Sequence, residues 1–287
     1  MATGYILYNP LAGNGTVEQS VEALQTNLPE TTQCFDVTKI TNYKAFLAGM
    51  DPEDYLVITG GDGTLNRFVN DVSGMNFPQD VLYYPAGSGN DFARDMDQAN
   101  CGSAFAVKQW IQELPTVEVN GHTYRFINGV GFGIDGYCCQ VGDELKQTPG
   151  KKVDYTAIAI KGLLVHFQPR NAQVVVDGQH YSYQKVWIAP TMLGRFYGGG
   201  MIPAPLQRRT DPERKLSVTI FGGAGRLRTL CVFPSIFKGE HVKHTKQVAV
   251  HTGHEITVTF DRPTPLQIDG ETIPNVTSYT ARWKKER

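Results

Sequence analysis

The segment Gly60-Gly61-Asp62-Gly63-Thr64 constrains this chain most, because it separates two different secondary-structure patterns. Residues 55–58 before it are apolar and largely branched, which is typical of a buried strand in a parallel sheet. Apolar side chains after it recur at helical spacing over residues 65–72. A glycine-rich turn from such a strand into a helix predicts an α/β domain.

This turn also has the chemistry of a phosphate-binding loop. The first turn of a helix leaves backbone N–H groups unpaired at the positive end of the helix dipole, and glycines let an anion come close to them. Asp62 would repel a phosphate unless a cation lay between them, so the loop predicts a divalent metal, most simply Mg²⁺. The plainer interpretation is a tight turn with Thr64 as the helix cap, since the lysine of a P-loop is missing.

Two further polar loops follow predicted strands in the first half of the chain. The strand over residues 5–8 leads into Asn9, Pro10 and Gly13, followed by a helix from near residue 16 to residue 28. The strand over residues 81–84 leads into a loop that contains Gly87, Ser88, Asn90 and Asp91. Because ligands of doubly wound sheets bind outside the carboxyl ends of the strands, these loops and Gly60–Thr64 are expected at one edge.

Two further elements are predicted in the first half of the chain. Residues 35–38 predict the second strand, which would end at Thr38, whose hydroxyl would reach a nucleotide or cap the next helix. Asn90 or Asp91 would likewise serve as an N-cap. Residues 104–114 predict a helix that ends before Pro115.

The second half of the chain has a different pattern of predicted secondary structure. Short alternating strands and a turn at residues 120–121 indicate a mostly antiparallel β-sandwich. We therefore predict an α/β nucleotide-binding domain over residues 1–119 and a β-rich domain over residues 120–287 that binds the second substrate. Residues 266–271 predict a strand that enters a tight Asp-Gly turn just before Glu271.

The three loops together resemble, in order and spacing, the motifs of the diacylglycerol kinase catalytic domain family, which includes sphingosine and ceramide kinases and soluble bacterial diacylglycerol kinases. The segment Asn-Asp-Phe-Ala-Arg at residues 90–94 is its most specific part. The resemblance implies an ATP-dependent lipid kinase that uses Mg²⁺ and most simply converts diacylglycerol to phosphatidic acid. It implies nucleotide contacts from Asn9, Pro10, Gly13, Thr38, Gly60, Gly61, Asp62, Gly63, Thr64, Gly87, Ser88, Asn90 and Asp91.

The resemblance also assigns acidic residues, and this chain departs from the pattern at two places. Asp62 and Glu271 are the implied catalytic pair, with Glu271 as the acceptor of the lipid hydroxyl proton. Glu118 and Asp211 match further metal positions of bacterial members, but a longer side chain stands at the first and extra residues surround the second. Arg67 replaces a glutamate common in the family, and it would contact phosphate or lie on the exposed face of the helix.

Charge and composition limit the partners and the compartment. A formal net charge of -1 argues against a nucleic-acid partner. The absence of a signal-peptide pattern or a long apolar stretch, and five cysteines without a C-x-x-C pair, predict a cytoplasmic protein. Basic residues of the second half, Arg208 and Arg209 among them, predict peripheral contact with a membrane surface that supplies the lipid. A homodimer is compatible with the sequence.

Two other functions stay open at this stage. An NAD kinase-like enzyme would share the Gly60 loop but not Asn9-Pro10 or the segment at residues 90–94. A catalytically silent lipid- or nucleotide-binding module is disfavoured because Asp62 and Glu271 are both present, whereas Arg67 and the altered loop at Asp211 favour it.

Overall fold

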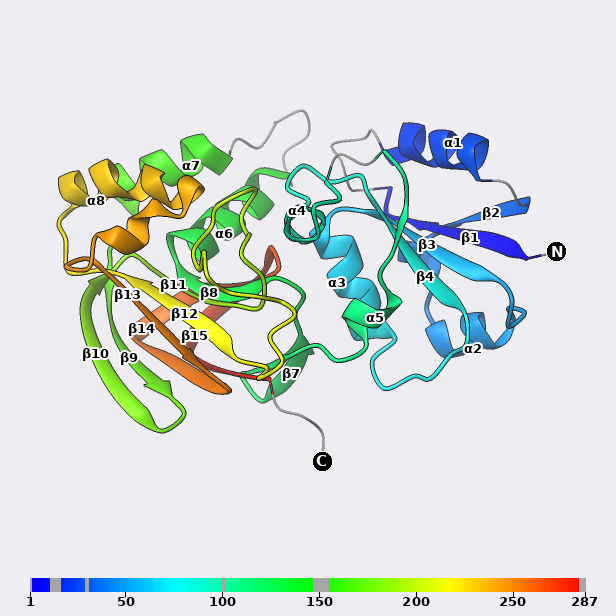
Figure 1. Cartoon of the computed structure of the whole chain (residues 1–287). Coiled ribbons are helices and arrows are strands. Elements are labelled where there is room, and N and C mark those ends of the chain that lie inside the picture. Colours follow the sequence, from blue (N-terminus) through cyan, green and yellow to red (C-terminus); the bar gives the residue numbers. More distant parts are fainter. Residues whose placement is uncertain (1, 11–16, 29–30, 100–101, 147–154, 284–287) are drawn as a thin grey trace. The chain divides into compact units, whose positions relative to one another are not determined.

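The computed structural model describes residues 2–10, 17–28, 31–99, 102–146 and 155–283 (Figure 1). It divides into two compact units, Met1–Leu114 and Pro115–Arg287. The first unit contains, in chain order, β1 (Thr3–Tyr8), α1 (Val17–Asn27), β2 (Thr31–Asp36), a 3₁₀ turn η2 (Val37–Lys39), α2 (Tyr43–Ala48), β3 (Tyr55–Gly60), α3 (Asp62–Asp71), β4 (Asp80–Pro85), α4 (Asp91–Asp95), β5 (Phe105–Ala106) and α5 (Lys108–Ile111).

The first unit is a doubly wound α/β domain, as predicted. Its sheet has the order β2-β1-β3-β4-β5, and only the short β5 is antiparallel to its neighbour. Helix α1 covers one face of this sheet, and α2, α3 and α5 lie on the other (Figure 1). The chain passes from β1 to β2 on one side and then crosses to β3 on the other side of β1, so the direction of the strand order reverses there. Ligands of such sheets bind at this reversal, outside the carboxyl ends of the strands.

Two predicted elements of the first unit are wrong. The second strand ends at Asp36 rather than Thr38, because the Asp36 carboxylate accepts hydrogen bonds from both the backbone N–H and the hydroxyl of Thr38 (2.9 and 2.7 Å) and turns the chain. The helix predicted over residues 104–114 is the strand β5 followed by the single turn α5. Phe105 pairs with Tyr83 and stacks on Phe92, so packing overrides helical propensity there.

The second unit consists of a large sheet with helices packed against it. Its elements are β6 (Thr116–Val119), β7 (His122–Arg125), β8 (Gly129–Gly133), α6 (Ile134–Lys146), α7 (Tyr155–Lys161), a π-helical turn η3 (Gly162–His166), β9 (Arg170–Val176), β10 (Gln179–Val186), β11 (Ile188–Met192), β12 (Leu216–Phe221), α8 (Arg226–Val232), 3₁₀ turns η4 (Phe233–Lys238) and η5 (Glu240–Lys243), β13 (Val248–Gly253), β14 (Glu255–Ile268) and β15 (Glu271–Arg282).

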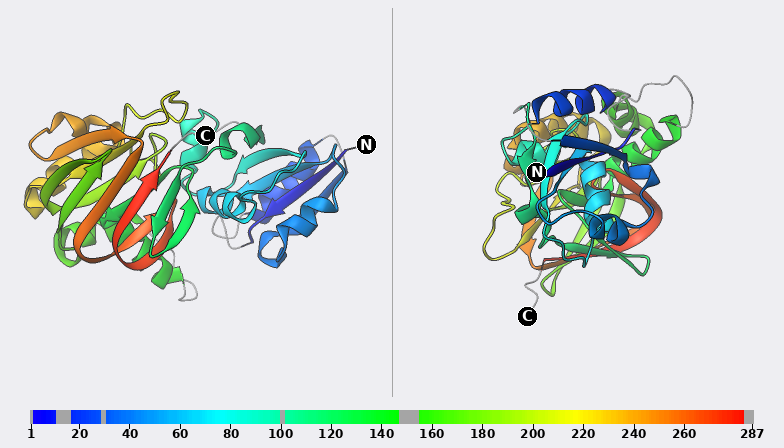
Figure 2. Two further views of the ribbon diagram at one scale, coloured as in Figure 1. Left: turned by 90° about the horizontal axis from the view of Figure 1, so that it is seen from below. Right: turned by 90° about the vertical axis from the view of Figure 1, so that its right-hand side faces the viewer.

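Every strand pairing described in the second unit is antiparallel, which confirms the predicted β-rich domain. The sheet runs β13-β12-β11-β8-β14-β15-β6-β7 (Figure 2). The long strand β14 pairs with β9 over Ile256–Phe260 and with β8 over Leu266–Ile268, and its register with β15 shifts between these two parts. The single strand β14 therefore connects β9 to β8, as bent strands do at the corner of a sandwich.

The predicted Asp-Gly turn connects β14 to β15. Asp269 and Gly270 both have positive φ angles (48° and 95°), which is the conformation of a two-residue hairpin turn. The buried Asp269 carboxylate accepts hydrogen bonds from the backbone N–H groups of Ile127, Asn128 and Gly129, at 2.6, 2.8 and 2.9 Å. Asp269 therefore fixes the start of β8, more than a hundred residues away in the sequence.

No helix among the described residues is both long and apolar enough to cross a membrane.

Candidate active site

The loops that follow β3 and β4 touch at two glycines. A Cβ on Gly61 would lie 3.2 Å from Gly87 Cα, and a Cβ on Gly87 would overlap Gly61 Cα. Gly61 has an ordinary extended backbone, with φ of -89° and ψ of -175°. The close approach of the two loops, not an unusual conformation, therefore requires glycine at Gly87 and leaves little room for a side chain at Gly61.

Asp62 lies at the N-terminus of two helices. It is the first residue of α3, and its carboxylate accepts hydrogen bonds from the N–H groups of Asp91 and Phe92 (2.9 and 2.8 Å), the first two residues of α4. Negative charge is favourable at both helix ends. The prediction that Thr64 caps α3 is wrong, since Gly61 is the N-cap and Thr64 is buried within the helix.

The segment at residues 90–94 locks the second loop in place. Asn90 is the N-cap of α4, with a left-handed backbone, but its side chain turns back and makes hydrogen bonds to both the N–H and the carbonyl of Gly87 (2.9 and 2.8 Å). Phe92 is buried against Tyr83, and Arg94 donates to the carbonyl of Gly89 (2.9 Å). Asp62, not Asn90 or Asp91, thus supplies the side-chain cap of α4.

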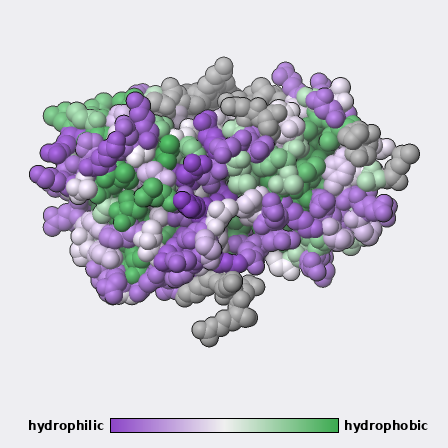
Figure 3. All heavy atoms as spheres, in the orientation of Figure 1, coloured by the Kyte–Doolittle hydropathy of each residue, from purple (hydrophilic) through white to green (hydrophobic). Residues whose placement is uncertain are grey.

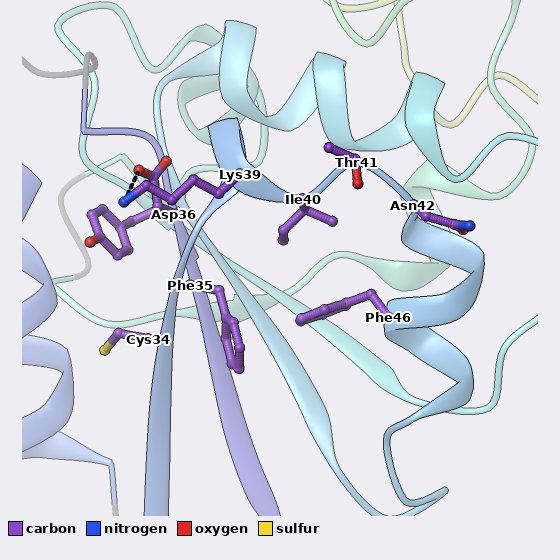
Figure 4. A pocket seen from close by; sticks show the side chains of 9 residues that line it. Cys34, Phe35, Asp36, Lys39, Ile40, Thr41, Asn42 and Phe46 are labelled. Carbon is purple, nitrogen blue, oxygen red and sulfur yellow. Dashed lines mark ion pairs between the residues drawn. The ribbon is translucent and has the colours of Figure 1, made fainter.

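A pocket of about 500 Å³ lies beside these loops, at the carboxyl ends of β1 and β2 (Figure 4). Its size is in the range of small-molecule sites. Phe35 from β2 and Phe46 from α2 meet edge to face in it, with ring centroids 5.0 Å apart. The complete lining is Tyr8, Cys34, Phe35, Asp36, Lys39, Ile40, Thr41, Asn42 and Phe46.

The remaining residues predicted to contact the nucleotide lie around this edge. Asn9 and Pro10 directly follow β1, and Ser88 is exposed in the loop after β4. Thr38 lies in the chain between the lining residues Asp36 and Lys39, and its hydroxyl donates to Asp36. Gly13 lies outside the described residues.

Glu271 is the exposed first residue of β15, directly after the Asp269-Gly270 turn, and its backbone pairs with Ile268. The hydrogen bonds that shape the turn come from neighbouring residues, because the Gly270 N–H donates to Gln267 Oε1 (2.8 Å) and Asp269 binds the start of β8. Glu271 is therefore held at a fixed place while its side chain reaches solvent.

The two additional predicted metal ligands have other partners. Glu118 on β6 forms an ion pair with Arg282 (2.9 Å), and the Asp211 carboxylate accepts hydrogen bonds from the N–H groups of Glu213 and Lys215 (both 3.1 Å). Within the described part of the chain, no three His, Cys, Asp or Glu side chains form a metal-binding group. Arg67 is exposed and lies 3.7 Å from Asp71, as expected for the solvent face of α3.

Asp135 is a buried acid to which the sequence pattern assigns no role. It stands in the first turn of α6, with 6% of its surface exposed, and the Tyr197 hydroxyl donates to its Oδ2 (3.3 Å). Its Oδ1 is buried and has no hydrogen-bond partner among the described residues. Burial raises the pKa of the Asp135 carboxyl to about 6. The only sequence signal for it was its place after the glycine-rich segment at residues 129–133.

Replacing Asp135 by Asn is expected to remove a pH dependence of stability. The carboxyl pKa rises from 3.8 to about 6 on folding, so this group destabilises the protein increasingly from about pH 4 to pH 6 and fully above that. Asn keeps an acceptor for Tyr197. The unfolding free energy of the variant minus that of the unaltered protein should therefore rise by about 2.5 kcal/mol between pH 4 and pH 7.5, as measured by urea unfolding. A difference that does not change with pH would contradict this.

Both units match known domain families. Residues 3–117 match the family described as diacylglycerol kinase catalytic domain, and residues 128–282 match the one described as YegS C-terminal NAD kinase beta sandwich-like domain. The two matches cover the α/β unit with its glycine loops and the antiparallel unit with the Asp-Gly turn.

Individual proteins that resemble this chain are also named as diacylglycerol or lipid kinases. The chain is 25% identical over 290 residues to the Mycobacterium tuberculosis (strain H37Rv) protein named diacylglycerol kinase, covering 93% of this chain and 91% of the relative. It is 25% identical over 243 residues to YtlR of Bacillus subtilis (strain 168), provisionally named a lipid kinase, covering 75% and 73%. A solved Bacillus anthracis (strain Sterne) structure, provisionally named a diacylglycerol kinase, has a TM-score of 0.66 at 17% identity, covering 98% and 91%. This last likeness concerns the fold.

Proposed function

Because the chain belongs to the diacylglycerol kinase catalytic domain family, we propose that it transfers the terminal phosphoryl group of ATP to a lipid hydroxyl, most simply that of diacylglycerol. The observation that carries this proposal is the pair of interlocked loops at Gly61 and Gly87, next to a pocket of small-molecule size. Phosphoryl transfer depends on positioning and on neutralising phosphate charge, and such loops at strand ends are suited to both.

In this proposal the nucleoside lies in the pocket at the ends of β1 and β2, where the rings of Phe35 and Phe46 offer apolar contact to a base. The loop at residues 60–64 and the start of α3 face the phosphates with backbone N–H groups. Asn9, Pro10, Thr38, Ser88 and the loop residue Gly13 complete the nucleotide contacts.

The residues at the loops fit a magnesium ion. Asp62 and Asp91 bring carboxylate oxygens, which Mg²⁺ prefers, to the ends of neighbouring strands. Both carboxylates are near enough to Tyr83 to help raise the pKa of its hydroxyl, for which burial is the main cause. Asp62 would hold the ion, which when bound neutralises phosphate charge. Glu118 and Asp211 are weaker candidates, because neither belongs to these loops; Glu118 pairs with Arg282, and Asp211 accepts the N–H groups of its own turn.

Glu271 is proposed as the base that accepts the proton of the lipid hydroxyl. A carboxylate can do this when it is within hydrogen-bond reach of the hydroxyl, and Glu271 has an exposed side chain on a backbone held by its pairing with Ile268. In this proposal Asp62 acts at the phosphates and Glu271 acts on the acceptor hydroxyl.

The direct test is transfer of labelled phosphate from ATP, with Mg²⁺, to a panel of acceptors. We expect a labelled lipid from dispersed diacylglycerol and none from NAD. Labelling of NAD instead would favour the NAD kinase-like function. ATP binding without transfer to diacylglycerol, sphingoid base or ceramide would favour a silent binding module.

A further inference from the structure

The outer face of the helices on the second unit is apolar and basic. Helix α7 with η3 and helix α8 with η4 bury one side against the sheet, through residues such as Leu163, Val232 and Ile236. The opposite sides should be polar if they only met water. Instead they expose large apolar side chains, to 48% at Ile160, 46% at Leu164, 67% at Val165, 79% at Leu227 and 50% at Phe237.

The two helical segments form one surface, which we call the helical face (residues 155–166 and 226–238). The Arg226 guanidinium donates to the carbonyl of Leu163 (2.8 Å) and lies over the Trp187 ring, so it joins the start of α8 to η3. Hydrophobic atoms gather over α7 and α8 in the space-filling view (Figure 3). Along α8 and η4 the exposed residues 227, 231, 234 and 237 follow one side of the helix.

The charge of the helical face is of one sign. Lys161, Arg226, Arg228 and Lys238 lie in these segments, which contain no Asp or Glu. The prediction that Arg209 contacts a membrane surface is wrong. Arg209 is buried and donates to the Ile127 carbonyl and to Asn128 Oδ1. Lys161, Arg228 and Lys238 are exposed beside the apolar side chains of the helical face, whereas Arg208 is exposed near Leu206 outside it.

We propose that the helical face docks on a lipid bilayer that carries anionic headgroups. Apolar side chains interleaved with lysine and arginine, without acidic residues, are the pattern of helices that lie in a membrane interface. A second copy of the chain fits less well, since a two-fold contact would place these like charges against one another. The proposal deepens the proposed function and rests on it in one respect: a lipid kinase must reach its acceptor at a membrane.

The test separates docking from catalysis. Vesicles of phosphatidylcholine alone, or with phosphatidylglycerol, are sedimented with the unaltered protein, with Val165→Glu and Leu227→Glu variants, and with Gln179→Glu, which adds the same charge at an exposed position outside the helical face. We expect at least about tenfold weaker binding to anionic vesicles for the first two variants, unchanged binding for the control, and weaker binding of the unaltered protein at high salt. Equal binding of all variants would overturn the proposal.

A dye on a natural cysteine reports the contact directly. Cys231 is exposed on the helical face, whereas Cys34 is exposed on β2 of the first unit. With Cys101 and the partly exposed Cys139 replaced by Ser in both proteins, an environment-sensitive dye on Cys231 (in Cys34→Ser) should shift to the blue on addition of anionic vesicles. The same dye on Cys34 (in Cys231→Ser) should not. Shifts at both sites or at neither would contradict docking through this face.

Phosphate transfer to a short-chain diacylglycerol below its micellar concentration distinguishes the two proposals. If Leu227→Glu keeps this activity but loses activity on vesicles, docking is supported. If the unaltered protein phosphorylates the monomeric acceptor but does not bind anionic vesicles, the docking proposal fails alone. Vesicle binding without any transfer would contradict the kinase and leave the docking surface supported. A change from dimer to monomer in Leu227→Glu, without vesicle binding by the unaltered protein, would assign the face to self-association and overturn the proposal.

Discussion

Replacing Asp62 by Asn is expected to lower the rate of phosphate transfer by about 10³-fold or more. In the proposed site this carboxylate holds the cation that neutralises phosphate charge, a contribution of several kcal/mol, and about 4 kcal/mol corresponds to 10³ in rate. The measurement is kcat for ATP and dispersed diacylglycerol over a range of Mg²⁺ concentrations. Activity equal to that of the unaltered protein would remove Asp62 from the reaction.

The structure adds a second effect, which the experiment has to separate. Both Asp62 oxygens accept N–H groups of α4, and the amide nitrogen of Asn cannot accept, so the variant should also lose about 1–3 kcal/mol of unfolding free energy. Asp54 provides a matched control, because its two oxygens accept the N–H groups of Thr3 and Asp51 (2.8 and 2.9 Å) where β1 and β3 begin, at the opposite edge of the sheet. Asp54→Asn should be destabilised similarly and keep its activity. If it is equally inactive, the loss in Asp62→Asn reports folding.

Replacing Glu271 by Gln is expected to lower kcat by about 10²–10⁴-fold while KM for ATP changes little. A positioned base contributes this much to proton transfer, and the amide of Gln cannot take up the proton. The β14–β15 turn should survive, because Asp269, Gly270 and Gln267 make its hydrogen bonds. Binding of ATP, measured by calorimetry, should be unchanged.

The control for this variant is Glu213→Gln, which removes another exposed carboxylate of the second unit, and its activity should equal that of the unaltered protein. The unfolding free energy of Glu271→Gln should stay within about 0.5 kcal/mol, as is usual for a surface position. A folded Glu271→Gln variant with full activity would move the base elsewhere. Asp269 is unsuitable for this test, because its replacement would leave three buried N–H groups of the β8 start without their acceptor.

The sequence predicted the parts of the fold that depend on local pattern. Branched residues before Gly60 and helical spacing after it predicted the strand β3 and the helix α3, with ends that differ from the structure by up to about three residues. Local pattern does not indicate the strands β8 and β11, because glycines at residues 129–133 and Pro190 are unusual within strands. Gly133, with φ of 126°, passes so close to the Trp187 backbone that no side chain would fit, a reason visible only after folding.

For the candidate site as well, the sequence indicated local features but not the contacts between distant segments. The motif around Asp62 indicated a functional loop, but not that its carboxylate caps a helix 29 residues later. The burial of Arg209 and Asp135 likewise depends on packing against segments far away in the chain. Sequence spacing therefore located the loops, whereas the partner of each charged group followed from tertiary contacts.

The position of β14 and β15 in the sheet has a consequence for synthesis of the protein. These two strands follow every other strand of the second unit along the chain, yet they stand in its middle, between β8 and β6. A nascent chain on the ribosome can complete the parallel sheet of the first unit once residue 106 has emerged. The second unit has to wait for residue 282, and until then the inner edges of β8 and β6 lack their neighbours and are open to pairing with other chains.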